Sequence, residues 1–276
     1  MEIDRQSECD STIRRVVDRI MTAYLKGQTL VLLTDYDGTL VPFFDHPQNA
    51  RLTPQAREAL EQLANLPRVR VGILSGRSID DLRCIAGLRG VYFGGTGGIE
   101  MEIEGNVVLP PEAINVRDLV LKVRDHLTTG LMEYPGVWIQ EKRYGITLHY
   151  QNLATDRISL LRASVADVLQ CHRGELRIIE CLRGIEITPD IGLSKGTAVR
   201  SIVDHLAGQS TFVVYAGDEA NDAEAIAAAT ELGGIGLGVG DQAPSSAEFR
   251  IADSLAYTGL LATLRQRLSE TVTLSN

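Results

Sequence analysis

The sequence predicts an α/β fold, in which a Rossmann-like parallel sheet forms the core and a smaller α+β cap domain is inserted into it. Apolar strands without alternation are followed by helices in the first and last parts of the chain, as in parallel sheets covered on both faces. Between residues 104 and 187 the pattern changes, and two adjacent strands joined by a short turn favour antiparallel pairing. With 276 residues, the chain is long enough to build both domains.

The first part of the chain alternates between helix and strand. Apolar residues at helical spacing predict a helix over residues 12–26, which Gly27 ends. A continuous apolar run from Leu30 then predicts a buried strand. The next predicted elements are a helix that begins after the N-cap Thr53, a strand over 69–74 and a helix that begins after Ser78.

The last part of the chain repeats this alternation, so we expect it to return to the same sheet. The core is then discontinuous and is formed by residues 1–103 and 188–276. The predicted elements are a helix from Ser194 to about Leu206, a strand over 211–218, a helix over 221–229, a strand over 233–240 and a helix over 260–268.

The inserted cap domain is expected over residues 104–187. Two strands meet at a short turn near Tyr144, which indicates an antiparallel hairpin. After a first strand near Glu104, the predicted elements are a helix over 116–129, strands over 136–142 and 145–150, a helix over 156–170 and a strand over 175–180.

Composition excludes several classes of partner. Aromatic residues make up 5% of the chain and the net charge is −9, which argues against a nucleic-acid partner and against anionic membranes. Four cysteines show no C-x-x-C pair or dense spacing, as expected for thiols in a reducing compartment. The polar start lacks a signal-peptide pattern and no apolar run reaches membrane-spanning length, so we expect a cytoplasmic protein.

Two aspartates lie where the first buried strand ends. Asp35 and Asp37 are two positions apart, so both side chains leave the strand on one side, and Gly38 permits a sharp departure of the backbone. Open α/β sheets bind ligands at this end of their strands. Two carboxylates this close suit a mechanism in which one attacks phosphorus and the other donates a proton. A strand–turn junction that is merely capped by aspartates is the alternative.

A second acidic segment follows the strand over 211–218. Asp218 ends this strand, and Asp222 lies one helical turn later. Mg²⁺ prefers a few carboxylate oxygens together with water and substrate phosphate. We therefore expect a Mg²⁺ site made by Asp35, Asp218 and the backbone carbonyl of Asp37, with Asp222 orienting waters.

Two further segments have the residue types of a phosphate site. Ser75, Gly76 and Arg77 follow the buried strand over 69–74, where a hydroxyl and backbone N–H groups can hold a phosphate oxygen. Lys195 lies at the start of a helix, beside exposed N–H donors. Taken alone, each segment is equally well explained as a helix N-terminus or a surface lysine.

Together, the four segments in this order resemble the haloacid dehalogenase-like (HAD) phosphohydrolases: Asp-x-Asp-Gly-Thr, Ser-Gly-Arg, Lys195 and Gly-Asp-Glu-x-x-Asn-Asp. The resemblance implies a HAD-like core and a Mg²⁺-dependent phosphatase. It implies that Asp35 is the nucleophile, that Asp37 is the general acid and base, and that Ser75 and Lys195 bind the phosphoryl group. Asp218 would bind Mg²⁺, supported by Asp222.

Within that superfamily the chain is similar to trehalose-6-phosphate phosphatases. The stretches DYDGTLVP, ILSGR, GIEITP and SKGTAV carry the similarity, together with a lysine and a histidine spaced by seven in the hairpin. By position, Lys142, His149 and Glu186 match residues of that family that bind sugar hydroxyls. The implied substrate is trehalose 6-phosphate, and the implied pathway partner is a glycosyltransferase.

Several positions depart from that family's pattern. Gln140 stands where an acidic residue is expected, although the adjacent Glu141 would compensate after a change of register. Gln151 replaces arginine, and Gly97 replaces histidine. These departures concern substrate recognition, so a phosphatase of another glycosyl or sugar phosphate, or a sugar phosphomutase, remains the alternative. A regulatory protein that keeps the fold without the activity is a third hypothesis, which the intact acidic set argues against.

Overall fold

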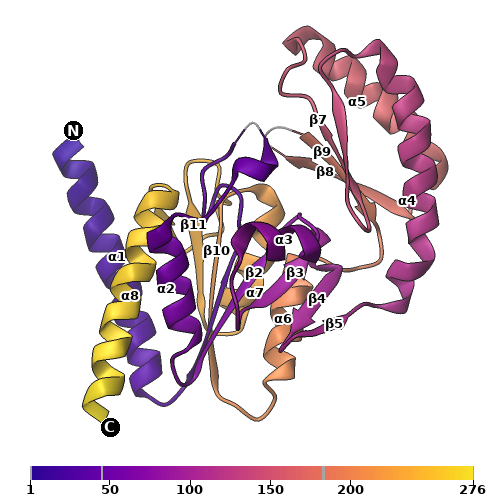
Figure 1. Ribbon diagram of the computed structural model, residues 1–276. Coiled ribbons are helices and arrows are strands. Elements are labelled where there is room, and N and C mark those ends of the chain that lie inside the picture. Colours follow the sequence, from indigo (N-terminus) through magenta and orange to yellow (C-terminus); the bar gives the residue numbers. More distant parts are fainter. Residues whose placement is uncertain (1, 45, 182–183, 276) are drawn as a thin grey trace. The chain divides into compact units, whose positions relative to one another are not determined.

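The computed structural model describes residues 2–44, 46–181 and 184–275, in two compact units (Figure 1). The large unit comprises Met1–Val108 and Ser194–Asn276, and the small unit comprises Leu109–Leu193. The units therefore meet a few residues later in the chain than the predicted boundaries at 103/104 and 187/188. The reason is the pairing of two strands, β5 with the large sheet and β9 with the small one.

The large unit contains an eight-stranded sheet in the order β12-β11-β10-β1-β2-β3-β4-β5. The strands from β12 to β3 run parallel, and β4 and β5 are added antiparallel. The strands are β1 (Thr29–Thr34), β2 (Val69–Leu74), β3 (Tyr92–Gly95), β4 (Glu100–Ile103), β5 (Asn106–Val108), β10 (Thr211–Gly217), β11 (Ile235–Val239) and β12 (Phe249–Ile251).

Helices cover both faces of this sheet. Alternate residues of β1 enter two separate apolar clusters: Leu30 and Leu32 pack in one, and Val31 and Leu33 in the other. The first cluster includes α1 (Glu2–Leu25), α2 (Pro54–Ala64), α3 (Ile79–Ala86) and α8 (Ser254–Ser275); the second includes α6 (Lys195–His205) and α7 (Ala223–Glu231). The predicted parallel core is confirmed.

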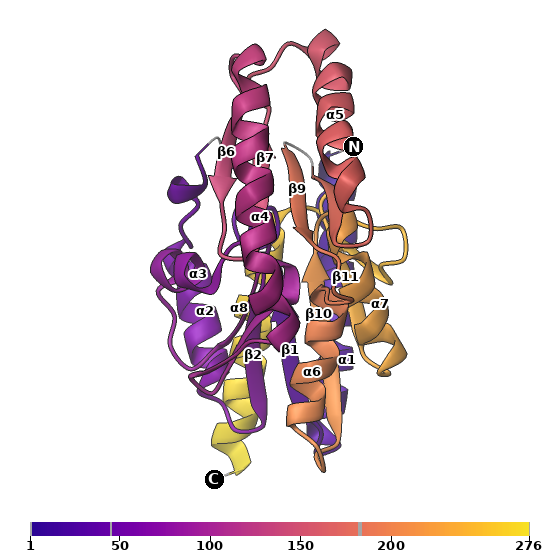
Figure 2. The ribbon, with the colours of Figure 1, turned by 90° about the vertical axis from the view of Figure 1, so that its right-hand side faces the viewer.

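The small unit is a four-stranded antiparallel sheet in the order β6-β7-β9-β8, backed by two helices. Ile146, Leu148, Ile185 and Ile187 pack in one apolar cluster with residues of these two helices. The ribbon shows both helices on the same face of the sheet (Figure 2). The predicted hairpin is confirmed, and Lys142 N donates to Gly145 O across its turn. The elements are α4 (Pro111–Gly130), β6 (Trp138–Glu141), β7 (Ile146–His149), α5 (Thr155–Leu169), β8 (Leu176–Cys181) and β9 (Gly184–Pro189).

The sequence did not predict β3, β4, β9 and β12, of which β3, β4 and β12 are only three or four residues long. Short strands offer little periodicity, and the glycines of β3 conceal its strand character. The strand expected near Glu104 is β5, which pairs with β4 rather than with the inserted sheet. Among the described residues, no helix combines the length and the apolar character needed to cross a membrane.

Candidate active site

Three neighbouring strands of the large unit bring the predicted segments to one edge of the sheet. β1 lies between β10 and β2, and Thr34 pairs with Ala216 on one side and Ile73 on the other. Each of these three strands ends at this row of paired residues or one residue beyond it. Asp35 follows β1, Ser75 follows β2 and Asp218 follows β10, so residues far apart in the sequence become neighbours.

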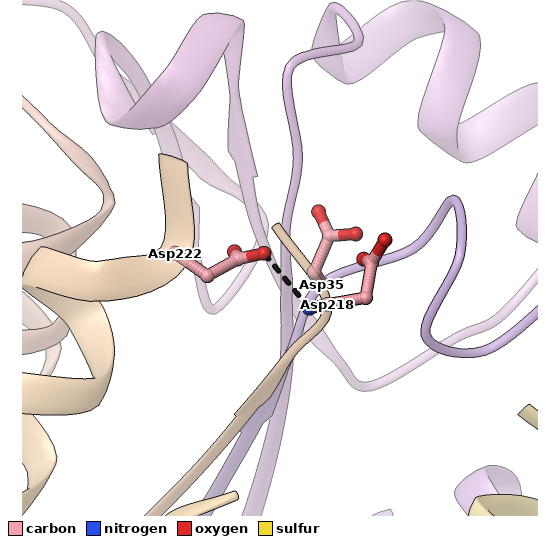
Figure 3. A group of neighbouring side chains, drawn as sticks. All are labelled: Asp35, Asp218 and Asp222. Carbon is pink, nitrogen blue, oxygen red and sulfur yellow. Dashed lines mark hydrogen bonds between the residues drawn. The ribbon is translucent and has the colours of Figure 1, made fainter. Parts of the chain in front are cut away.

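Asp35, Asp218 and Asp222 form a buried acidic cluster (Figure 3). One carboxylate oxygen of each lies within 4.8 Å of those of the other two. All three residues are at most 5% exposed, so water screens their mutual repulsion poorly. A cluster of this kind needs cations to hold it together.

Lys195 provides one of those cations. As the first residue of α6, it is 3% exposed, and its Nζ lies 2.6 Å from Asp35 Oδ1 and 2.7 Å from Asp222 Oδ1. Burial disfavours its charge, but the neighbouring Asp222 and Asp35 outweigh this and raise the pKa of Lys195 above its ordinary value. Ser194 caps α6 with a full capping box, which fixes the helix start that carries the lysine.

Asp222 acts as the fixed hub of the cluster. Its Oδ1 accepts hydrogen bonds from Lys195 and from the Tyr215 hydroxyl at 2.6 Å. Its Oδ2 accepts from the backbone N–H groups of Asp218 at 3.0 Å and Glu219 at 3.2 Å. With both oxygens engaged in this way, Asp222 is better suited to orient Lys195 and the Asp218 loop than to bind a metal directly.

Asp218 is held against the first acidic loop. Its Oδ1 accepts a hydrogen bond of 2.9 Å from the Thr39 hydroxyl. Gly38 has φ of +90°, and a Cβ atom there would lie 2.1 Å from Asp218 Oδ2. Glycine is therefore required at this position for two reasons: its backbone conformation and the close approach of Asp218.

Arg77 contacts the carboxylates of Asp37 and Asp81. Its guanidinium donates to both oxygens of Asp37, at 2.6 and 2.8 Å, and to Asp81 at 2.7 Å. The phosphate contact that the sequence predicts for Arg77 stays a prediction. Burial disfavours the charge of Arg77, but its hydrogen bonds to Asp37 and Asp81 raise its pKa above the ordinary value. This fork fixes the Asp37 carboxylate near the end of β1.

Ser75 is buried beside a left-handed turn. Its Oγ accepts from the Arg77 backbone N–H at 3.2 Å, and Gly76 lies between the two residues in the same loop. Gly97 N donates to Ser75 O, and Thr96 N donates to Arg77 O, so the turn that follows β3 braces the loop.

The cluster fits a divalent cation. Three carboxylates face one lysine, and burial raises the pKa of Asp35 above its ordinary value and that of Asp218 to about 7. A hard cation with oxygen ligands would relieve this cost, and Asp35 and Asp218 are the carboxylates least engaged by other donors.

The predicted sugar-binding residues lie on the small unit. Lys142 Nζ and Glu186 Oε1 form an ion pair of 2.6 Å, with both side chains at most 8% exposed. His149 Nε2 lies 2.8 Å from Gln140 Oε1. Glu141 instead forms an ion pair with Arg124 of α4, on the opposite face of the sheet, so the change of register considered for it does not occur.

Sequence reasoning assigned no role to Thr39 or Tyr215, although both hold the acidic cluster in place. Thr39 belongs to the Asp-x-Asp-Gly-Thr segment, so the motif itself was a usable signal. Tyr215 lies inside an apolar strand, where nothing in the sequence distinguishes it from a core residue.

Comparison with known proteins identifies the family. The sequence profile described as trehalose-phosphatase matches residues 33–253, which include both acidic segments, Ser75 and Lys195. The chain belongs to the trehalose-phosphatase family.

Similar members of this family come from mycobacteria. The chain is 34% identical over 195 residues to a trehalose-phosphate phosphatase of Mycobacterium tuberculosis, which covers 69% of this chain and 49% of that protein. It is 30% identical over 266 residues to that of Mycobacterium leprae, covering 91% and 61%. The chain thus spans about half the length of the curated relatives it matches.

The fold agrees with solved structures of trehalose-phosphatase family members. The C-terminal domain of Candida albicans trehalose-6-phosphate phosphatase superimposes with a TM-score of 0.80 at 21% identity, covering 91% of this chain and 96% of that domain. This likeness supports the architecture of a parallel core with an inserted α+β unit.

Replacing Gly38 should disturb both the backbone and Asp218. We expect Gly38→Ala to reduce the free energy of unfolding by more than the roughly 1–2 kcal/mol of a left-handed alanine, because its Cβ also displaces Asp218. Mg²⁺ affinity, measured by calorimetry, should fall as well. Gly27→Ala is the matched control, since Gly27 has φ of +89° with nothing within 4 Å of the added Cβ. Equal effects of the two variants in urea unfolding would contradict the close approach.

Replacing Arg77 with lysine tests the fork on Asp37. Lysine keeps the charge but cannot pair both carboxylate oxygens in one plane. We expect Arg77→Lys to lower the free energy of unfolding by about 1–3 kcal/mol, measured by urea unfolding. The exposed Arg200, which pairs with Glu231, is the control, and Arg200→Lys should change stability by less than about 0.5 kcal/mol. A stability of Arg77→Lys equal to that of this control would contradict the fork.

Metal binding should depend on pH. In the metal-free cluster burial raises the pKa of Asp218 to about 7, so below that pH a proton competes with the cation. We expect the apparent Mg²⁺ affinity to be highest above pH 7 and to fall by up to about tenfold per unit below it. Calorimetry at pH 6, 7 and 8 checks this, and an affinity that is constant over this range would contradict it.

Proposed function

We propose that this chain is a Mg²⁺-dependent phosphatase that hydrolyses trehalose 6-phosphate to trehalose and phosphate. The observation that carries the proposal is the convergence of Asp35, Lys195 and the Asp218 loop at one edge of the sheet. Membership of the trehalose-phosphatase family supports the substrate. The activity of the longer mycobacterial relatives agrees with it.

Asp35 is the nucleophile in this proposal. Its carboxylate attacks phosphorus, the bond from phosphorus to the sugar oxygen breaks, and an aspartyl-phosphate forms. Asp37 gives its proton to the departing sugar oxygen. It then takes a proton from the water that attacks the aspartyl-phosphate, which releases phosphate and restores Asp35.

Charge compensation explains the remaining residues. A phosphoryl transition state spreads negative charge over its equatorial oxygens while the attacking carboxylate is itself an anion. Lys195 and Ser75 would bind the phosphoryl oxygens, and Lys195 already lies against the nucleophile. Asp35, Asp218 and the backbone carbonyl of Asp37 would hold Mg²⁺, which supplies further positive charge. Asp222 would keep Lys195 and the Asp218 loop in position.

Arg77 has a positioning role in this scheme. Its fork keeps the Asp37 carboxylate at a fixed place beside the loop of Ser75. For proton transfer, one of these two hydrogen bonds must break and the freed Asp37 oxygen must take up a proton, which it then gives to the substrate oxygen. We therefore assign to Arg77 the positioning of the general acid Asp37, in addition to the phosphate contact expected from the sequence.

The small unit would provide recognition of the sugar. We assign Lys142, His149 and Glu186 to contacts with sugar hydroxyls, because they lie on one face of its sheet and supply donors and acceptors. A phosphorylated disaccharide is made by a glycosyltransferase, so we expect such an enzyme as the pathway partner. We expect the reaction to take place in the cytoplasm.

Replacing the nucleophile tests the proposal. We expect Asp35→Asn to reduce phosphate release from trehalose 6-phosphate by about a thousandfold or more, because the amide cannot attack phosphorus. The thermal midpoint should not fall, since the change removes one buried negative charge. Asp204→Asn is the control, an exposed aspartate near the far end of α6 that should leave turnover unchanged.

The assay uses a panel of phosphorylated monosaccharides and disaccharides with Mg²⁺, followed by a chelator. Phosphate release should be greatest with trehalose 6-phosphate, should stop on chelation and should return with added Mg²⁺. Isomerised sugar phosphate without phosphate release would identify a phosphomutase instead. Full turnover by Asp35→Asn or after chelation would falsify the mechanism.

A further inference from the structure

The turn that joins β3 to β4 has an unusual backbone conformation at its first residue, Thr96. This residue is completely buried and has φ of +47°. The left-handed region is disfavoured for residues with a Cβ, and most of all for β-branched residues such as threonine. Residues held in such conformations cluster at functional sites, where the surrounding structure keeps them in place. Thr96 is therefore a candidate for a functional role.

A buried carboxyl group holds Thr96 in this conformation. Thr96 Oγ1 donates to Glu100 Oε1 at 2.6 Å, and Glu100 is 1% exposed. Glu100 is the first residue of β4 and pairs with Gly95 at the end of β3, so the two strands bring the carboxyl group back to the turn. Away from water such a hydrogen bond is strong, and it offsets the cost of the left-handed backbone.

On one side, the turn holds the loop that follows β2. Thr96 N donates to Arg77 O at 2.7 Å, and Gly97 N donates to Ser75 O at 2.9 Å. Both carbonyls belong to the loop that carries the Ser75 hydroxyl. The position of this hydroxyl therefore depends on the backbone of the turn.

On the other side, the turn packs against the start of α6. A Cβ atom added at Gly98 would lie 2.4 Å from Ser194 O and 3.1 Å from Ala198 Cβ. The backbone of Gly98 is thus in direct contact with the residue that precedes Lys195. Ser194 is also the N-cap of α6, so a shift of Ser194 would move Lys195 with it.

We propose that Thr96 is a positioning residue, which keeps the turn Thr96–Gly98 in the shape that sets the spacing between Ser75 and Lys195. The turn contacts the loop of Ser75 on one side and the start of α6 on the other. Because both residues would bind oxygens of one phosphoryl group, a change in their spacing would misalign that group for attack by Asp35. This inference rests on the proposed function in one respect, that Ser75 and Lys195 bind the phosphoryl group.

The competing explanation is that the turn only connects two strands. In that case substitutions in the turn would lower the melting temperature, and the variants would bind phosphate normally at temperatures where they are folded. Positioning predicts instead that folded variants bind phosphate more weakly. The two explanations therefore differ in the phosphate affinity of the folded protein.

Alanine at Gly98 tests the contact with α6. Gly98 has φ of +98°, so Gly98→Ala adds backbone strain together with a Cβ that displaces Ser194. We expect the dissociation constant of inorganic phosphate, measured by calorimetry on the full chain with Mg²⁺, to rise roughly tenfold or more. Gly208→Ala is the matched control, since Gly208 has φ of +87° with no described atom within 4 Å of the added Cβ. Equal phosphate affinities of the two variants would overturn the proposal.

Two substitutions of Thr96 separate its hydroxyl from its shape. Thr96→Val keeps the branched shape and removes the hydroxyl that bonds to Glu100, whereas Thr96→Ser keeps the hydroxyl. Well below both melting temperatures, we expect Thr96→Val to lower kcat and phosphate affinity about tenfold, and Thr96→Ser to stay within about twofold of the unmodified chain. Equal phosphate affinities of these two variants would show that the turn has no positioning role.

The positioning role and the proposed function fail independently, because phosphate binding requires no turnover. Suppose that the unmodified chain releases no phosphate from any sugar phosphate, while Gly98→Ala and Thr96→Val bind phosphate about tenfold more weakly than it does. This result would refute the proposed function and leave the positioning role in place. Normal phosphate release by the unmodified chain, with unchanged phosphate affinity in both variants, would do the reverse.

Discussion

The buried contact of Lys195 with Asp35 and Asp222 is the interaction on which the site depends. Two carboxylates from the segments that follow two separate strands are brought together away from water, where their repulsion is weakly screened. Lys195 bridges them at 2.6 and 2.7 Å, and the cap of α6 fixes the position from which it reaches them. The parallel sheet, the helix start and the acidic loops are therefore parts of one electrostatic arrangement.

Sequence patterns predicted this arrangement well, because its parts are local. Asp35 and Asp218 each follow an apolar strand, and Lys195 follows a recognisable N-cap. Because parallel strands have their carboxyl ends at the same edge of a sheet, residues that follow these strands are predicted to lie close together. The strands β3, β4 and β12 have only three or four residues, which is too few to display a period, whereas the equally short β6 and β7 were predicted from the turn that joins them.

The contacts that the sequence does not predict involve distant residues. Nothing in the sequence shows that Arg77 reaches back to Asp37, 40 positions earlier. The sequence suggests that Glu141 could take the role of Gln140. Alternation along β6 instead directs Glu141 towards Arg124 of α4, and Gln140 is the residue that contacts His149. Tyr215 lies in an otherwise apolar strand, so the sequence does not show that its hydroxyl donates to Asp222, which follows that strand.

The central claim is that Asp35 accepts the phosphoryl group beside a cation held by Asp218. The most direct measurement is a crystal structure of the full chain with Mg²⁺ and beryllium trifluoride, a mimic of a phosphoryl group. The account predicts beryllium bonded to the Asp35 carboxylate, fluorides at Lys195 and Ser75, and Mg²⁺ touching Asp218. Beryllium fluoride on any other side chain, or Mg²⁺ bound away from Asp218, would contradict it.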